Sequence, residues 1–240
     1  MGIEVLRLSR GKGNAIDDGF LDELVRRLDA LGDADGVVLT GEGKFFSAGL
    51  ALPVVSAFDR PAMKAFMRRF GAAMQRVFTF PRPVVAAING HAVAGGCVLA
   101  LQCDVRLAAD GTQQIGLNEA AIGIGLPTLV LETLRLQVPP SSLVPIAVEG
   151  KLFGPRKALE LGLVESVVPA AELEERAVAR ARELASIPRA AYAFVKAALR
   201  RPVVEVVERY TASDDERWLD TWFSPEGRER VGAAVKRLSG

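Results

Sequence analysis

The sequence predicts an α/β fold, and three patterns support this prediction. Short apolar runs of strand length alternate with longer amphipathic segments of helical period through the first half of the chain. Glycine and proline separate these segments. From about Pro155 onward the pattern is mainly helical. We therefore expect a layered α/β domain that is followed by a helical C-terminal region.

The N-terminal elements are a strand, a turn, a helix and a second strand. Residues 4–8 alternate between apolar and polar side chains, as a half-buried strand does, and residues 11–14 are typical of a turn. The acidic pair at 17–18 can cap an amphipathic helix that ends near Gly32. The apolar run 37–40 is the next strand.

The middle of the chain repeats this order of elements. Pro61 can open a helix with an apolar face, which stops before Pro81. Residues 84–88 form an apolar strand, residues 95–102 a buried helix that starts at glycines, and residues 104–108 a further strand.

The C-terminal part of the chain is predicted to be helical. Residues 171–238 hold three or four helical stretches, which we expect to break at Pro188, Pro202 and Pro225 because proline disrupts the interior of a helix. No low-complexity segment or flexible linker separates these stretches. We therefore expect this part to pack on the core or on another subunit.

Composition argues against several classes of function. The chain has 240 residues, of which 30 are Lys or Arg and 29 are Asp or Glu, so no bulk charge favours nucleic acid. The two cysteines, Cys97 and Cys103, have neither metal-site nor disulfide-framework spacing. No apolar run approaches the ~18 residues of a membrane span, and residues 1–4 carry no signal-peptide pattern. We expect a soluble, cytoplasmic protein that binds neither nucleic acid nor membrane.

Two loops of small residues carry the strongest functional signal. Residues 45–50 (FFSAGL) and 87–96 (AINGHAVAGG) each follow an apolar run of strand type. Each loop can present backbone N–H groups to a developing negative charge, which is what enolate chemistry on a thioester requires. Either loop alone also fits an ordinary strand-to-helix turn, in which glycine only relieves strain.

Both loops, in this order, resemble the oxyanion-hole segments of the crotonase superfamily, also called the enoyl-CoA hydratase/isomerase family. Residues 155–169, with Gly-Leu-Val and Val-Val-Pro motifs, resemble its helix-turn-strand segment. The resemblance covers about residues 3–236. It implies a crotonase-type spiral of β-β-α turns over 1–186 and a helical oligomerisation region over 187–240, assembled as a homotrimer or homohexamer. The apolar residues expected at subunit contacts are Val203, Val206, Val207, Trp218 and Trp222.

The same resemblance implies a binding site for an acyl-CoA thioester. By position in the motifs, the backbone N–H groups of Leu50 and Gly95 would form the oxyanion hole. Coenzyme A would be part of the substrate, and neither a separate cofactor nor a metal is implied. The implied substrate contacts are Ser47, Ala48, Gly49, Ala51, Leu52, Gly96, Val98 and Lys236. Basic residues on a terminal helix, such as Lys236 and Arg237, are also often simply solvated.

Three positions differ from the family pattern. The family usually has an aspartate two residues after the glycine of the first loop, and this chain has Ala51 there. In the second loop, the family's common Gly-Gly-Gly run is replaced by Ala94-Gly95-Gly96. The glycine-rich basic segment after the second glutamate is replaced by residues 126–129. We expect the oxyanion hole to survive these changes and the acyl pocket to differ in shape.

The chain keeps one of the two glutamates that hydratases of this family use. The first position is Val98, which can neither exchange a proton nor hold a water, and the second is Glu119. One glutamate is the arrangement of the family's Δ3,Δ2-enoyl-CoA isomerases, in which it moves a proton from C2 to C4. Apolar neighbours would raise the pKa of Glu119 toward that of a working base. Alternatively, the Glu119 carboxylate only interacts favourably with the dipole at a helix N-terminus and takes no part in chemistry.

Other chemistry has weaker support in the sequence. His91 is the only histidine and occupies a turn, so neither a catalytic triad nor a metal site is recognisable. Residues 41–44 lack the spacing of a phosphate-binding loop. Trp218, Trp222 and Phe223 can share a helical face, which indicates a core or subunit-contact role.

These observations predict an enzyme that stabilises a thioester enolate, foremost a Δ3,Δ2-enoyl-CoA isomerase. A hydratase is the alternative if Glu132, Glu149 or a water network replaces the missing glutamate, and a lyase, decarboxylase or hydrolase is also open because the scaffold hosts several reactions. A non-catalytic acyl-CoA-binding subunit is an alternative from another class. The resemblance places the activity in fatty acid metabolism.

Overall fold

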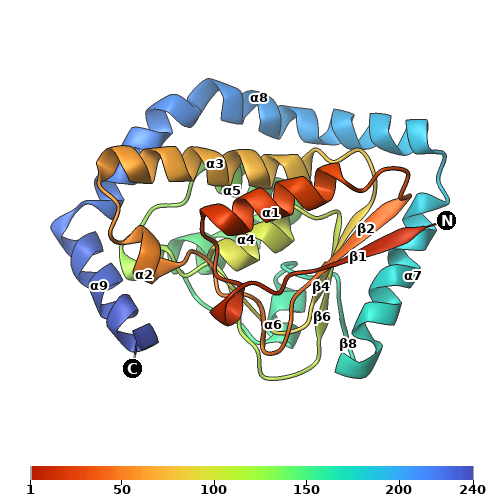
Figure 1. Ribbon diagram of the computed structural model, residues 1–240, viewed down its shortest axis with the longest axis horizontal. Helices are drawn as coiled ribbons and strands as arrows, with labels where there is room; N and C mark the ends of the chain where they lie inside the picture. Colours follow the sequence, from red (N-terminus) through yellow and green to blue (C-terminus); the bar gives the residue numbers. More distant parts are fainter. Residues whose placement is uncertain (1, 240) are drawn as a thin grey trace.

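Two parallel β-sheets, with helices around them, form the fold (Figure 1). The computed structural model describes residues 2–239. For Lys12, Leu238 and Ser239 it describes the backbone alone. The five-stranded sheet has the order β1 (Ile3–Arg7), β2 (Gly36–Thr40), β4 (Val84–Ile88), β6 (Val105–Ala109) and β8 (Ser166–Val168). The three-stranded sheet has the order β3 (Phe45–Ser47), β5 (His91–Val93) and β7 (Ile115–Gly116). The predicted α/β class is confirmed.

The helices complete a repeating spiral. They are α1 (Asp18–Asp29), α2 (Leu52–Val55), α3 (Arg60–Phe78), α4 (Gly95–Leu101), α5 (Thr128–Gln137), α6 (Pro155–Glu160), α7 (Leu173–Ala185), α8 (Arg189–Trp222) and α9 (Pro225–Ser239). Shorter turns are η1 (Lys12–Asn14), η2 (Ala120–Ile122), η3 (Pro140–Ser142), η4 (Val144–Val148) and η5 (Ala170–Glu172). From β2 to α5, each turn of the chain adds one strand to each sheet and then a helix. The expected spiral of β-β-α turns is therefore confirmed.

The strands β2 and β4 are buried on both faces. Because side chains alternate along a strand, Val37 and Leu39 enter the main core, whereas Val38 points to the opposite face. There it packs with Leu173 and Ala177 of α7. This double burial explains why these strands are continuous apolar runs in the sequence.

The predicted element boundaries differ from the observed ones by one to three residues. The Asp17 carboxylate accepts a hydrogen bond from the N–H of Phe20 at 2.8 Å, so the predicted cap of α1 is confirmed. The helix predicted over 95–102 is α4 and ends at Leu101. The strand predicted over 104–108 is β6, which is shifted by one residue.

The prediction that the chain breaks at Pro202 is wrong, because α8 continues through this residue. Figure 1 shows α8 running across the molecule above α3 in this view, with α9 folding back at its end. Proline removes one hydrogen bond from a helix interior, at a cost of about 3 kcal/mol. Buried residues on both sides of it, Arg200 and Val203, hold α8 against the core. The predicted breaks at Pro188 and Pro225 are confirmed.

The residues expected at subunit contacts are mostly buried within the chain itself. Val203, Val207, Trp218 and Trp222 are each at most 8% exposed. They face the core because α8 lies along α3 and α5, so this part of the prediction is wrong. Across residues 2–239, no helix has both the length and the apolar character that crossing a bilayer requires.

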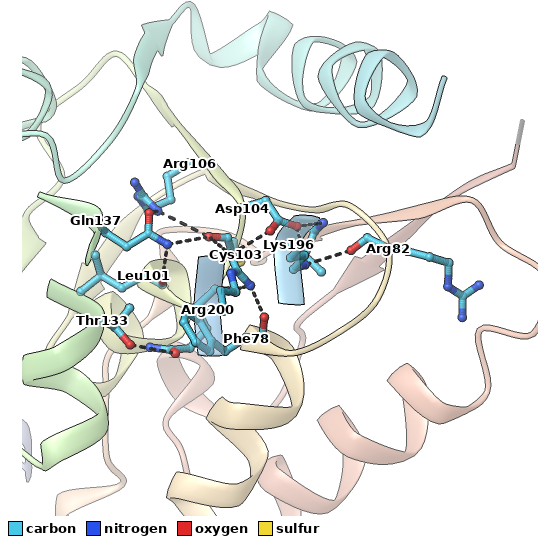
Figure 2. Close-up of polar contacts among 12 residues, drawn as sticks. Phe78, Arg82, Leu101, Cys103, Asp104, Arg106, Thr133, Gln137, Lys196 and Arg200 are labelled. Atoms are coloured by element: carbon cyan, nitrogen blue, oxygen red, sulfur yellow. Dashed lines mark hydrogen bonds and ion pairs between the residues drawn. The ribbon is translucent and has the colours of Figure 1, made fainter. Parts of the chain in front are cut away.

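A buried polar cluster fixes the first half of α8 to the core (Figure 2). The carboxylate of Asp104 contacts Lys196 Nζ at 2.7 Å and Arg200 Nη2 at 2.8 Å. The guanidinium of Arg200 also donates to the carbonyls of Phe78 and Cys103, near the C-terminal ends of α3 and α4. Helix C-termini carry unpaired carbonyls and favour cations, so Arg200 caps two helices at once.

Candidate active site

The first small-residue loop connects β3 to α2 and leaves one N–H free. The Ile16 N–H donates to the carbonyl of Gly49 at 2.8 Å, and the Ala51 N–H donates to the carbonyl of Ile16 at 2.9 Å. The N–H of Leu50 lies between these two bonds and has no partner among the described residues. Ser47 is fully buried, and its Oγ donates to the carbonyl of Asn14 at 2.8 Å. Ser47 therefore supports the loop from behind.

The second loop meets the first at the start of α4. Gly95 is the first helical residue, so its N–H has no carbonyl partner within the helix. Gly49 has a φ of +85°, and a Cβ placed on it would lie 3.0 Å from the nitrogen of Gly95. A Cβ on Gly96 would lie 2.1 Å from the carbonyl oxygen of Ser47. The two glycines therefore let the free N–H groups approach one another.

Ala94 carries strain at the junction with α4. Its φ of +50° and ψ of −124° lie outside the regions that residues with a Cβ readily adopt. Such positions cost about 1–3 kcal/mol and persist where the surroundings fix them. This conformation of Ala94 turns the chain so that α4 begins at Gly95, with the Gly95 N–H beside the first loop.

Glu119 lies in the loop between β7 and α5. Its carbonyl accepts hydrogen bonds from Ile122 at 3.0 Å and Ile124 at 2.9 Å, which close a tight turn around η2. Its Oε2 is buried and has no hydrogen-bond partner among the described residues. Burial away from water raises the pKa of Glu119 to about 7. The carboxylate is thus poised to exchange a proton near neutral pH.

The C-terminal helices hold the Glu119 loop in place. Trp218 Nε1 donates to the carbonyl of Gly125 at 2.9 Å, and the Gly125 N–H donates to Thr221 Oγ1 at 2.9 Å. From α9, the guanidinium of Arg230 donates to the carbonyl of Ala121 at 3.2 Å. Both ends of the loop are therefore fixed by α8 and α9, which makes these helices part of the site.

A cavity of about 310 Å³ brings these groups together. Six of the residues predicted from the sequence line it: Ala48, Leu50, Leu52, Gly95, Val98 and Glu119. Ser47, Gly49, Ala51 and Gly96 lie behind the lining and shape the loops. Among the described residues, Arg237 lines the cavity whereas Lys236 does not. Of the two C-terminal cations considered from the sequence, Arg237 is therefore the one at the cavity.

Most of the opposite wall comes from residues that no sequence motif indicated. It consists mainly of apolar and aromatic residues from α3, α5, α8 and the Glu119 loop: Met67, Phe70, Asn118, Ile122, Ile124, Pro127, Val130, Trp218 and Trp222. The interpretation of the two tryptophans as ordinary core or subunit contacts is therefore incomplete, because they also line the cavity. Their spacing of four residues could have indicated one shared face, but not what that face covers.

The other candidate residues lie outside this cavity. His91 Nδ1 accepts a hydrogen bond from the N–H of Gln114 at 3.1 Å, which is a structural contact. Glu132 pairs with Arg135, and Glu149 pairs with Lys151. Within the described part of the chain, no group of three or more His, Cys, Asp or Glu could hold a metal ion.

Comparisons with known proteins agree with this geometry. A family model described as enoyl-CoA hydratase/isomerase matches residues 1–231. The human protein enoyl-CoA delta isomerase 1, mitochondrial, is 32% identical over 205 residues, which are 83% of this chain and 68% of that protein. A probable enoyl-CoA hydratase from Bacillus subtilis is 28% identical over 98% of this chain and 93% of that protein.

Solved structures show the same relation. The crystal structure of human mitochondrial Δ3-Δ2-enoyl-CoA isomerase matches with a TM-score of 0.93 and 28% identity, over 99% of this chain and 94% of that chain. The chain belongs to the enoyl-CoA hydratase/isomerase family, has the crotonase fold, and is an enzyme.

Proposed function

We propose that this member of the enoyl-CoA hydratase/isomerase family is a Δ3,Δ2-enoyl-CoA isomerase. One observation carries the proposal: among the described residues that line the cavity, Glu119 is the only carboxylate. Moving a double bond requires one group that takes a proton and returns it elsewhere. Hydration requires a water to be held and activated as well, and the side chain at the other family position is that of Val98.

Each step of the isomerisation has a group in the cavity to perform it. The N–H groups of Leu50 and Gly95 donate to the thioester oxygen as negative charge develops there. Glu119, ionised, takes a proton from C2 and returns it to C4 of the resulting enolate. A carboxyl pKa of about 7 suits both halves of this transfer near neutral pH. The apolar lining keeps bulk water from the enolate.

Two further observations support isomerase over hydratase. Glu132 and Glu149, which could have replaced the missing glutamate, are engaged in ion pairs outside the cavity. The human relative, with 32% identity, is named as an enoyl-CoA isomerase. Separately, we infer that Arg237, which lines the cavity, attracts the phosphates of coenzyme A, together with Lys236 beside it on α9.

We expect the purified protein to isomerise a 3-enoyl-CoA much faster than it hydrates a 2-enoyl-CoA. Val98→Glu would place a second carboxylate next to the reacting carbons and should introduce or increase hydration. Val98→Gln is the matched control, since it adds similar bulk and polarity without a base. Rates of both reactions, followed by absorbance of the conjugated thioester, check this. Efficient hydration by the wild type would support the hydratase instead.

We further propose that the enzyme is a homotrimer or homohexamer assembled through residues 187–240. The first half of α8 presents Phe194, Val195 and Leu199 to solvent with 74%, 53% and 64% of their surfaces exposed. An exposed apolar patch of this kind marks an interaction surface. Sedimentation should give a mass of three or six chains, and the double variant Phe194→Glu, Leu199→Glu should lower it. A wild-type mass near 25.6 kDa at micromolar concentration would contradict the assembly.

A further inference from the structure

A second cavity, of about 120 Å³, lies beside the first and is lined by residues of α3, α5 and α8. Some residues line both cavities: Met67, Phe70, Pro127, Val130 and Trp218. A residue that lines two cavities lies between them, so these side chains form a thin partition between the two spaces. The isomerisation proposed above uses the first cavity alone.

The inner surface of the second cavity is apolar. Beyond the partition, it is lined by Leu129 of α5 and by Val207 and Leu219 of α8, and each of these side chains is at most 8% exposed. An apolar ligand that enters this space removes its own surface from water against these side chains. The cavity therefore favours hydrocarbon over a polar ligand.

The polar residues at the second cavity are already paired within the protein. Arg68 Nε contacts Asp215 Oδ2 at 3.3 Å, and Thr128 Oγ1 donates to Asp214 Oδ2 at 2.6 Å. Lys64 forms an ion pair with a carboxylate of α8. In the part of the chain that the structure describes, no buried polar side-chain atom without a partner belongs to this cavity. Hydrocarbon can therefore fill it without leaving a polar group unpaired.

Met67 is the movable part of the partition. Its side chain is partly exposed, whereas Phe70 and Val130 are only 3% and 1% exposed and belong to the core. Methionine is unbranched and has three rotatable side-chain bonds, so it adapts readily to what packs against it. A change of rotamer at Met67 can open a passage between the cavities while Phe70 and Val130 stay in place.

The acyl chain of a bound thioester is directed toward this partition, and here the inference rests on the proposed function. Arg237 reaches the first cavity from the last turn of α9. Figure 1 shows this end of α9 well apart from α3 and α5. With the phosphates of coenzyme A at Arg237 and the thioester oxygen at the N–H groups of Leu50 and Gly95, the far end of the acyl chain extends toward α3 and α5.

We propose that the second cavity binds the distal part of a long acyl chain and that Met67 moves aside to admit it. The enzyme then favours enoyl-CoA thioesters whose chains reach past Met67 over short-chain thioesters. Pro127, Thr128 and Leu129 line this cavity and belong to the segment 126–129 in which the chain differs from the family pattern. The preference for chain length is thus built partly from residues particular to this chain.

Gly71 provides a way to fill the second cavity without altering the first. It lines the second cavity but not the first, and a Cβ placed on it would meet no atom within 4 Å. Gly71→Leu should therefore occupy this space, and it should fold, because leucine favours a helix more than glycine does. Gly232→Leu is the matched control. It makes the same change in α9, where a Cβ also has open space and the residue lines neither cavity.

Binding of saturated acyl-CoA thioesters, from butanoyl-CoA to dodecanoyl-CoA, tests the proposal without requiring any reaction. In calorimetry, each methylene that the wild type buries should tighten binding by about fourfold. Gly71→Leu should match the wild type for short chains, and its affinity should stop rising at the length where the wild type begins to use the second cavity. Gly232→Leu should follow the wild type throughout.

The possible failures are distinguishable. The same dependence on chain length in the wild type and in Gly71→Leu would overturn the inference and leave the proposed function standing. Equal affinity of the wild type for butanoyl-CoA and dodecanoyl-CoA would do the same. Failure to bind any acyl-CoA would contradict the proposed function itself.

A variant at the partition tests the role of Met67. Met67→Ile keeps an apolar side chain but stiffens it, because branching at Cβ restricts its rotamers in a helix. Stopped-flow measurements should show that this variant slows association of dodecanoyl-CoA more than association of butanoyl-CoA. If both ligands were slowed equally, or neither was, Met67 would not control entry to the second cavity.

Discussion

Glu119→Gln should lower the kcat for isomerisation of a 3-enoyl-CoA by at least ~10² and leave ligand affinity nearly unchanged. General acid–base catalysis by a positioned side chain contributes about 10²–10⁴ in rate, and here a single carboxylate performs both proton transfers. Glutamine has the same shape but cannot exchange the proton. Because the oxyanion hole is intact in the variant, binding of acyl-CoA should persist and the loss should fall on kcat.

The pH dependence of the wild type follows from the raised pKa of Glu119, which is about 7. The base acts in its ionised form, so kcat should rise with pH and level off above neutral. Below the pKa the ionised fraction falls about tenfold for each pH unit, and kcat should fall with it. An ordinary exposed glutamate would place this transition near pH 4.3, so its position separates the two environments.

A matched variant separates the role of this carboxylate from a general effect of losing charge. Glu149→Gln makes the same change at a residue that pairs with Lys151 outside the cavity. It should leave both isomerisation and its pH profile unchanged. If Glu119→Gln retained wild-type turnover, or Glu149→Gln abolished it, the assignment of the acid/base would be wrong.

Local patterns predicted the alternation of strands and helices, but not the second sheet, which followed only from the family resemblance. The strands β2 and β4 are recognisable because burial on both faces makes them continuously apolar. β5 and β7 are only three and two residues long. Strands this short are stabilised by pairing with distant segments, and no periodicity within them can show it.

The site was predictable where it depends on backbone and loop composition. Glycines at 49, 95 and 96 indicated two close loops, and the apolar neighbours of Glu119 indicated its desolvation. The wall formed by α8 was not predictable in this way. Whether Trp222 lines the cavity depends on the course of α8, and the helix-breaking tendency of proline argues against a helix that continues past Pro202.

Asp104→Asn should reduce the free energy of unfolding by about 3–5 kcal/mol, which is the cost of leaving buried charges without their partner. Lys196 and Arg200 are 8% and 6% exposed, and the Asp104 carboxylate is the anion that pairs with both. The cluster holds the first half of α8, whose far end forms a wall of the cavity. Urea denaturation followed by circular dichroism measures the change as a shift in midpoint at constant slope.

The control and the pH dependence make this second expectation specific to the buried cluster. Asp110→Asn removes a carboxylate that pairs with Arg156 at the surface and should change stability by less than about 1 kcal/mol.

Burial lowers the pKa of Lys196 to about 8, although Asp104 opposes this shift. As pH rises through 8, Lys196 becomes neutral in the folded protein while it stays charged in the unfolded chain. The contribution of Lys196 to the free energy of unfolding therefore increases from about pH 8 up to the pKa that this lysine has in the unfolded chain. The loss caused by Asp104→Asn should therefore be smaller at pH 9 than at pH 7, because one of the two cations has been discharged. An equal loss at both pH values would show that the charge of Lys196 does not contribute to the destabilisation caused by Asp104→Asn.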